Sequence, residues 1–154
     1  MQSEPASPEE LDRLEARIDA WLLTERADNP AIAAVERGSS DERRWYIRLH
    51  GEDKEAWTAW WTLGQRTLRF ETFLLPAPQA NNEAFYAHLL RRNRELTGMA
   101  FEIGAEEAIF LGGSLPVGAI TDVELDRILG SMWAYVERVF RSALKIGFPP
   151  AATR

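Results

Sequence analysis

Few residues in this chain have the type and spacing that catalysis or metal binding requires. The sequence contains no cysteine and only two histidines, His50 and His88. Disulfides and every cysteine-ligated metal or iron–sulfur site are therefore excluded. Neither histidine has a second histidine at ligand spacing, so we do not expect a histidine-based metal site.

Nucleophilic chemistry is equally hard to place in the sequence. A serine–histidine–aspartate triad would have to use Ser114 or Ser131. The run Gly112-Gly113-Ser114 does not have the strand–turn–helix context of a hydrolase nucleophile. Read as a phosphate loop, it lacks the lysine that should follow, and Leu115-Pro116 comes next instead of a helix start. A glycine kink late in a strand is the simpler interpretation.

Acidic side chains gather in two short loops and mark no cleft. General acid–base catalysis needs a carboxylate that is desolvated in a cleft. We interpret these acids as solvated loop charge, although two such loops could together chelate a divalent ion. They are Glu52, Asp53, Glu55, Glu106 and Glu107. We therefore predict that the protein is not an enzyme and uses no cofactor or metal.

Length and charge limit the class of protein and its partners. The chain has 154 residues, 45% hydrophobic and 27% charged, which is typical of one globular domain. We predict a single domain over residues 7–148, with flexible tails at 1–6 and 149–154. A net charge of −6 argues against a nucleic-acid partner, because phosphates require a positive surface. With no signal-peptide pattern and no apolar run of membrane length, we expect a cytoplasmic protein without a membrane partner.

Arginine supplies almost all of the basic charge. The chain has 18 basic residues, and only Lys54 and Lys145 among them are lysines. Arginine suits planar, bidentate recognition better than lysine does. A codon bias toward arginine is the alternative explanation.

Three segments have the apolar spacing of amphipathic helices. The first begins at the capping box Ser7-Pro8-Glu9-Glu10 and stops at Asp28-Asn29-Pro30. The second covers residues 82–97, with Gly98 as a natural end residue. The third begins at a second capping box, Thr121-Asp122-Val123-Glu124, and continues to about residue 145. Each helix should bury its apolar stripe against a sheet.

Elsewhere the apolar period is two, which predicts strands. Alternation or apolar runs occur at residues 31–37, 45–50, 56–63, 67–75, 100–103 and 108–115. Short, glycine-containing connections favour antiparallel hairpins. The predicted fold class is therefore α+β, an antiparallel sheet of five to six strands with three helices, in the order α-β-β-β-β-α-β-β-α.

Alternation gives the predicted sheet two unlike faces. One is apolar and must lie under helices; it includes Trp45, Ile47, Leu49, Trp57, Ala59, Trp61, Leu63, Leu68, Phe70 and Leu74. The other mixes rings and charges at Tyr46, Arg48, Trp60, Arg69 and Glu71. If Gly64-Gln65 is a two-residue turn, Trp60 stands opposite Arg69, with Tyr46 on its other side. A tryptophan on such a surface is typical of partner hot spots; alternatively, a helix or a subunit covers this face and Trp60 is core.

The second helix carries further polar side chains of interest. Arg91 and Arg92 could reach carboxylates of a partner, whereas His88 is expected on a solvated face. Asn93 lies on the buried side, where an unsatisfied polar group costs about 1–3 kcal/mol. We expect it to bond to loop backbone.

Several segments resemble the bacterial YbjN family. They are Trp45-Tyr46-Ile47-Arg48-Leu49, Thr62-Leu63-Gly64-Gln65-Arg66-Thr67-Leu68, Phe70-Glu71-Thr72, Leu89-Leu90-Arg91-Arg92-Asn93, Phe101-Glu102-Ile103-Gly104-Ala105-Glu106 and Leu125-Asp126-Arg127-Ile128-Leu129-Gly130-Ser131. The resemblance covers roughly residues 10–148. It implies a type III secretion chaperone-like architecture and a role of the sensory-transduction regulator kind. Secretion members of that fold are homodimers that hold segments of client proteins.

Two functions remain open on the sequence. The first is a non-enzymatic protein-binding module, chaperone-like or regulatory, that holds a segment of an unidentified partner protein and could itself be a homodimer. The second is a small-ligand sensor that binds a metabolite between sheet and helix. For the first, the predicted partner-binding residues are Tyr46, Arg48, Trp60, Arg69, Glu71, Arg91 and Arg92.

Overall fold

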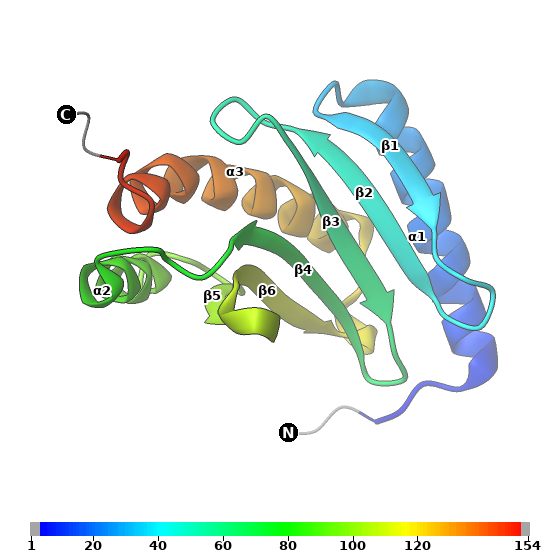
Figure 1. Cartoon of the computed structure of the whole chain (residues 1–154). Coiled ribbons are helices and arrows are strands. Elements are labelled where there is room, and N and C mark those ends of the chain that lie inside the picture. The colour runs from blue at the N-terminus through cyan, green and yellow to red at the C-terminus, as the bar shows by residue number, and fades with distance from the viewer. Residues whose placement is uncertain (1–3, 152–154) are drawn as a thin grey trace.

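One antiparallel sheet and three helices make up the computed structural model, which describes residues 4–151 (Figure 1). The helices are α1 (Pro8–Asp28), α2 (Asn82–Asn93) and α3 (Asp122–Gly147), and the strands are β1 (Ile32–Arg37), β2 (Arg44–His50), β3 (Ala56–Leu63), β4 (Thr67–Leu75), β5 (Ala100–Ile103) and β6 (Ile109–Pro116). The strand order across the sheet is β1-β2-β3-β4-β6-β5. The predicted α+β class and element order are confirmed.

Two of the helices begin at the hydroxyl caps that the sequence predicts. The Ser7 hydroxyl accepts a hydrogen bond from the Glu10 amide at 3.2 Å, and the Thr121 hydroxyl accepts one from the Glu124 amide at 3.1 Å. Such caps stabilise a helix by about 1 kcal/mol each, because they satisfy amides that have no partner within the helix. They fix where α1 and α3 start.

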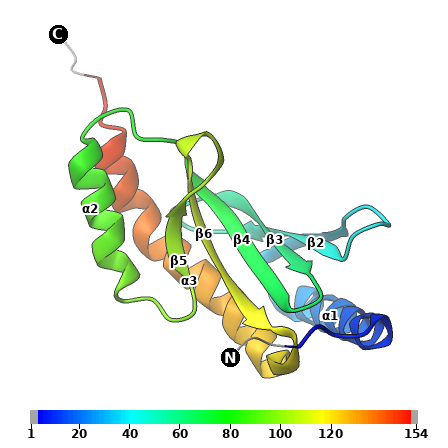
Figure 2. The ribbon, with the colours of Figure 1, turned by 90° about the horizontal axis from the view of Figure 1, so that it is seen from below.

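One face of the sheet is buried under α1 and α3 (Figure 2). Every predicted apolar-face residue from Trp45 to Leu74 is buried. Trp61 stacks on Trp21 of α1 with ring centroids 6.0 Å apart. The one polar side chain on this face in the described chain, Thr72, is fully buried and donates to the Thr58 carbonyl at 2.7 Å. The core therefore lies between the sheet and these two helices.

The register of the β3–β4 hairpin differs from the prediction. The Gly64 amide donates to the Thr67 carbonyl at 2.9 Å, so Gln65 and Arg66 form the tip instead of Gly64-Gln65. Moving the turn by one residue moves each cross-strand partner by two. Trp60 consequently pairs with Glu71, and the predicted pairing of Trp60 with Arg69 is wrong.

The pairing on the other side of β3 agrees with the sequence. Tyr46 stands opposite Trp60, as predicted. Near the N-terminus, Ala6 is buried and its amide donates to the Gln65 carbonyl at 2.8 Å, although it falls within the segment predicted to be a flexible tail. Residues 1–3 and 152–154 of the predicted tails lie outside the described residues.

The β5–β6 hairpin turns through a short 3-10 segment, Ala105–Glu107. Within it, Glu106 and Glu107 both have φ of 59°, in the left-handed region that favours glycine or asparagine. A side chain in this conformation costs roughly 1–2 kcal/mol per residue. The tip therefore carries two carboxylates on an unfavourable backbone.

None of the helices in residues 4–151 combines the length and the apolar character needed to cross a membrane.

Candidate partner-binding surface

The second face of the sheet has no helix over it within the described chain (Figures 1 and 2). It faces away from α1 and α3. We call it the open sheet face and define it by Tyr46, Arg48, Trp60, Arg69, Glu71, Phe73, Glu102 and Phe110. Five of the seven predicted partner-binding residues meet here. Within residues 4–151, the alternative in which a helix buries Trp60 is wrong, whereas the alternative in which a subunit covers this face stays open.

Trp60 lies near the middle of this face and is half-buried. Its indole Nε1 donates to Glu71 Oε1 at 2.7 Å, and its ring meets the ring of Phe110 edge-on at a centroid distance of 6.2 Å. These two contacts hold the indole in one orientation. A ring ordered before binding loses less conformational entropy when a partner arrives.

A second ring contact extends the apolar part of the open sheet face. Phe110 packs edge-on against Phe73 at 5.8 Å, and Phe73 is 39% exposed. Phe110 is not among the residues predicted from the sequence, because the rings that it contacts, Trp60 and Phe73, lie on β3 and β4 and are separated from it in the chain by α2 and β5. One pattern in the sequence could have found it: Phe110 alternates with Gly112 and Ser114 along β6, and residues in this alternation lie on the open sheet face.

Two exposed guanidinium groups lie diagonally on either side of Trp60. Arg48 is two residues from Tyr46 on β2, and Arg69 is two residues from Glu71 on β4. Arg48 approaches Glu36 at 3.6 Å, and Arg69 approaches Glu102 at 3.5 Å. Exposed ion pairs of this kind contribute at most about 1 kcal/mol. Either arginine can therefore exchange its present carboxylate for one on a partner at little cost.

Lys54 borders the aromatic part of the surface. Its Nζ donates to the carbonyls of Phe73 at 2.6 Å and Leu74 at 3.0 Å, and lies 5.1 Å from the Phe73 ring centroid. Burial lowers the pKa of this amine to about 8. The ammonium ties the β2–β3 loop to the end of β4 and so holds Phe73 in place.

The two remaining predicted residues lie elsewhere. Arg91 and Arg92 are on α2, which packs on α3 beside the sheet edge formed by β5 (Figure 2). Arg92 pairs with Glu95 at 3.2 Å, whereas Arg91 is exposed and forms no ion pair within the described chain. The predicted site is therefore split between the open sheet face and α2.

Asn93, the residue that follows Arg92 on α2, has a structural role. The Asn93 side chain donates to the Phe101 carbonyl at 3.2 Å and accepts from the Phe101 amide at 2.6 Å. Its expected bond to backbone is present, but to strand β5 instead of a loop. This contact also explains why α2 ends at Asn93, four residues before the predicted end at Thr97, since the chain must reverse to lay β5 alongside.

The expectation that His88 is solvated is wrong. Its Nε2 lies 2.8 Å from the Ser142 hydroxyl of α3, which in turn donates to the Val139 carbonyl at 3.1 Å. Burial, followed by the charges of Arg92 and Arg91, lowers the pKa of the imidazole below its ordinary value. His88 therefore belongs to the contact between α2 and α3.

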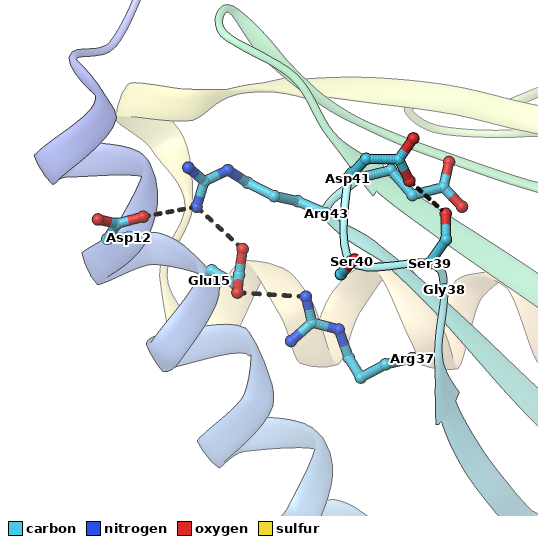
Figure 3. Close-up of a pocket in the computed structure, with 9 residues that line it drawn as sticks. Asp12, Glu15, Arg37, Gly38, Ser39, Ser40, Asp41 and Arg43 are labelled. Carbon is cyan, nitrogen blue, oxygen red and sulfur yellow. Dashed lines mark hydrogen bonds and ion pairs between the residues drawn. The ribbon is translucent and has the colours of Figure 1, made fainter.

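A polar hollow of about 560 Å³ lies at the opposite end of the molecule, between α1 and the β1–β2 loop (Figure 3). Arg43 contacts Asp12 and Glu15, each at 2.9 Å. The hydrogen bond that Arg43 donates to Asp12 is the main reason that the pKa of Arg43 is raised. In the loop, the Ser39 hydroxyl donates to Asp41 and lowers the pKa of that carboxyl.

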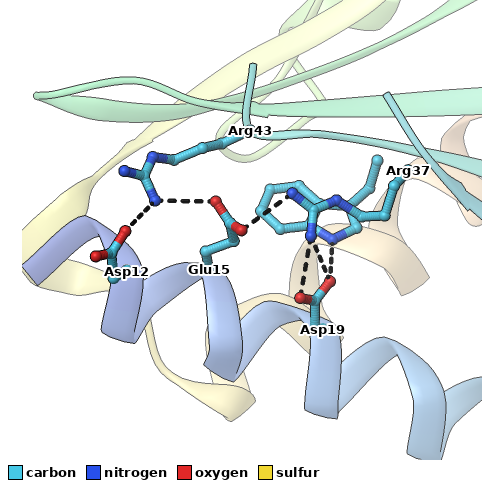
Figure 4. A network of polar contacts seen from close by, with 6 residues as sticks. Asp12, Glu15, Asp19, Arg37 and Arg43 are labelled. Carbon is cyan, nitrogen blue, oxygen red and sulfur yellow. Dashed lines mark hydrogen bonds and ion pairs between the residues drawn. The ribbon is translucent and has the colours of Figure 1, made fainter. Parts of the chain in front are cut away.

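The same cluster continues along α1 (Figure 4). Arg37 contacts Glu15 at 3.2 Å and Asp19 at 3.0 Å, and its guanidinium lies 4.7 Å from the Trp45 ring centroid. The Trp45 indole also donates to Asp19 at 2.7 Å. Both arginines that line the hollow therefore already face two carboxylates each. In the part of the chain that the structure describes, no group of three or more metal-ligating side chains could hold an ion.

Comparison with known proteins gives a family and several relatives. Residues 11–145 match the YbjN family, described as "Putative bacterial sensory transduction regulator". The uncharacterized proteins Rv0487 of Mycobacterium tuberculosis and Mb0497 of Mycobacterium bovis are each 33% identical over 108 residues, which is 70% of this chain and 59% of theirs. ML2442 of Mycobacterium leprae is 30% identical over 105 residues, 68% of this chain and 57% of its own. The matched region thus spans little more than half the length of these relatives.

Among solved structures, the chain is similar to one from the ExoU–SpcU complex of the type III secretion system of Pseudomonas aeruginosa. The TM-score is 0.48 and the sequence identity is 13%. The similarity covers 86% of this chain and 99% of that chain.

Proposed function

The chain belongs to the YbjN family, and from that premise we propose that it is a cytoplasmic, non-enzymatic protein-binding module that holds a segment of a partner protein on the open sheet face. One observation carries the proposal. Trp60 is oriented by Glu71 and Phe110 on a sheet surface that no described helix covers. Tryptophan and arginine are the side chains most enriched where binding energy concentrates.

The chemistry of the surface indicates what the partner segment contributes. Trp60, Phe73 and Phe110 offer ring surface for an apolar or aromatic side chain. Arg48 and Arg69 lie on either side of Trp60 and hold their present carboxylates only weakly. A segment with an apolar side chain flanked by acidic ones fits this arrangement. Charge-assisted hydrogen bonds to the guanidinium groups would set its orientation.

The small-ligand sensor has less support. The hollow between α1 and the β1–β2 loop is the polar cavity that a metabolite could enter. Its two arginines, however, are each satisfied by two carboxylates of α1. An anionic metabolite would have to displace them and leave the acids without partners.

A peptide-display selection tests the proposed function. Random peptides of about 12 residues, long enough to cross a sheet face of this size, are selected on the immobilised protein and measured by fluorescence anisotropy. We expect Trp60→Ala and Arg69→Ala to weaken the selected peptides at least about tenfold. Arg26→Ala, an exposed position on α1, is the control and should leave binding unchanged.

The result can contradict the proposal in two ways. Peptides that bind equally well to Trp60→Ala and to the unchanged protein would place the binding surface elsewhere. A selection that yields no peptide, together with a saturable thermal shift caused by a metabolite, would favour the sensor.

A further inference from the structure

An apolar hollow of about 300 Å³ lies between the end of α1 and the middle of α3, on the side of the sheet that these helices cover. Its floor is the buried Leu49 of β2, and α3 contributes the half-buried ring of Trp133. Every residue that lines it in the described chain is uncharged. We call it the α1–α3 groove and define it by Asn29, Ala31, Leu49, Leu129, Gly130 and Trp133.

Trp133 is ordered at this groove without help from a partner. Its indole Nε1 donates to the His50 carbonyl at 2.8 Å, which fixes the ring beside β2. A half-buried tryptophan held in this way loses little conformational entropy on binding. Tryptophan is also among the side chains most enriched where binding energy concentrates.

Gly130 is not required by any contact within the described chain. A Cβ built there meets no atom within 4 Å outside the backbone of its own helix. Gly147 of the same helix is different, because its Cβ would meet the Phe85 ring at 2.7 Å. Glycine weakens the interior of a helix, and its usual benefit is that another backbone can come close. Gly130 therefore leaves room for a second molecule beside α3.

Two carboxylates of α1 stand beside the groove. Glu25 accepts a hydrogen bond at 3.2 Å from the side chain of Asn29, which lines the hollow. Asp28 follows Trp21 by two helical turns and so lies on the same side of α1. That side faces α3, because Trp21 lines a neighbouring hollow together with Asp122. The end of α1, where the helix dipole is negative, lies at the same place.

A third carboxylate comes from α3. Asp126 precedes Gly130 by one turn and therefore shares its face of the helix. The basic residues next to these acids in the sequence are directed elsewhere. Arg127 pairs with Glu124 at 2.7 Å, and Arg26 lies two turns after Asp19, on the side of α1 that contacts β1. The three acids at the groove form no ion pair among residues 4–151.

We propose that the α1–α3 groove binds a segment of a partner protein that carries a bulky apolar side chain with lysine or arginine on both sides. The apolar side chain fills the hollow against Leu49 and Trp133, and the backbone of the segment approaches α3 at Gly130. The basic side chains face Glu25, Asp28 and Asp126. The charge of this segment is opposite to that proposed for the open sheet face. The proposal goes beyond the function of that face and does not depend on it.

Peptide arrays probed with the full chain test the chemistry of the segment. The peptides are about 12 residues long, with leucine, phenylalanine or tryptophan at the centre and lysine or arginine on both sides. One matched array has glycine at the centre, and another has glutamate at the basic positions. We expect binding to the first array and to neither of the others. Equal binding with glycine at the centre would mean non-specific attraction to an acidic protein and would overturn the proposal.

Variants test the place of binding by fluorescence anisotropy of the best basic peptides. Gly130→Leu fills the hollow from within the chain, and the free space around this position means that its melting temperature should not fall. It should nevertheless weaken these peptides at least about tenfold. Asp28→Lys and Asp126→Lys should weaken them as well. Glu83→Lys, at an exposed acid on α2, is the matched control and should leave their affinity unchanged.

Three results would overturn the proposal. They are an absence of binding to the basic array at about 100 µM protein, basic peptides that bind Gly130→Leu as tightly as the unchanged protein, and a dimer of the full chain that Gly130→Leu dissociates. The last result would assign the groove to a second copy of the chain. The two surfaces are separable, because Trp60→Ala should leave the basic peptides unaffected and Gly130→Leu should leave the acidic peptides of the open sheet face unaffected.

Discussion

The two ends of the molecule use arginine in opposite ways. At the α1 end, Arg37 and Arg43 each face two carboxylates of the same helix, beside the buried indole of Trp45. At the α2 end, Arg91 and Arg94 are exposed without ion pairs in the described chain, next to an exposed leucine. The first arrangement attaches a helix to the sheet. The second leaves charge and apolar surface available to another molecule.

The difference shows why residue type alone does not identify a binding surface. Both ends carry arginines near a helix and a sheet edge. Only the positions of the neighbouring carboxylates separate a group that stabilises the fold from one that can bind a partner. Arg48 and Arg69 on the open sheet face are intermediate between these two cases. Each forms an ion pair within the described chain, but that ion pair is long and exposed.

The largest expected change in the free energy of unfolding comes from removing the contact between Trp61 and Trp21 at the α1 end. Trp61 is fully buried and stacks on Trp21. Trp61→Ala should lower the free energy of unfolding by about 3–5 kcal/mol, because it removes the stacked ring and leaves a cavity. Urea denaturation followed by circular dichroism measures the change. A loss below about 1 kcal/mol would mean that α1 is not held through this contact.

A smaller effect is expected from the ion pairs of the same end. Glu15 is the residue that bridges Arg37 and Arg43. Glu15→Ala should lower the free energy of unfolding by about 1 kcal/mol, since both arginines keep one other carboxylate. Arg91→Ala is the matched control at the α2 end and should change it by less than about 0.5 kcal/mol. Equal effects at the two positions would remove the contrast between the ends.

The smallest effect concerns pH and the attachment of α2. The pKa of His88 lies below its ordinary value of 6.5 in the folded protein. As pH falls through 6.5, the unfolded chain takes up a proton that the folded imidazole still resists, so the free energy of unfolding decreases. His88→Gln should remove this part of the pH dependence. Above about pH 7.5, one unit above the ordinary pKa, the imidazole is neutral in both the folded and the unfolded chain, so its protonation no longer changes the free energy of unfolding.

The measurement is urea denaturation between about pH 5 and 8. If the His88→Gln variant keeps the pH dependence of the unchanged protein, burial beside Arg92 and Arg91 does not lower the pKa of the imidazole.

Much of the fold follows from local patterns in the sequence. The predicted bounds of β3, β4 and β5 agree with the structure, because alternation and glycine-containing turns are local signals. The register at Trp60 is not local in this sense. It depends on which amide closes the hairpin, and Gly64 closes it one residue later than the sequence suggested.

The candidate site was harder to predict than the fold, because it depends on contacts between distant segments. Phe110 reaches Trp60 only because β6 pairs with β4. His88 is half-buried because α3 crosses α2, which the spacing of residues within α2 does not reveal. The division of the predicted residues between two surfaces also follows from the strand order, since Arg91 and Arg92 lie on the helix beside β5.

The central claim is that a partner segment lies on the open sheet face, and photo-crosslinking tests it most directly. Ser114 is exposed and pairs with Arg69 across β4 and β6, so a p-benzoylphenylalanine placed there stands on this face. The same group at Leu23 on α1 is the control. The account predicts that a selected peptide crosslinks from position 114 and not from position 23. Crosslinking from position 23 alone would contradict it.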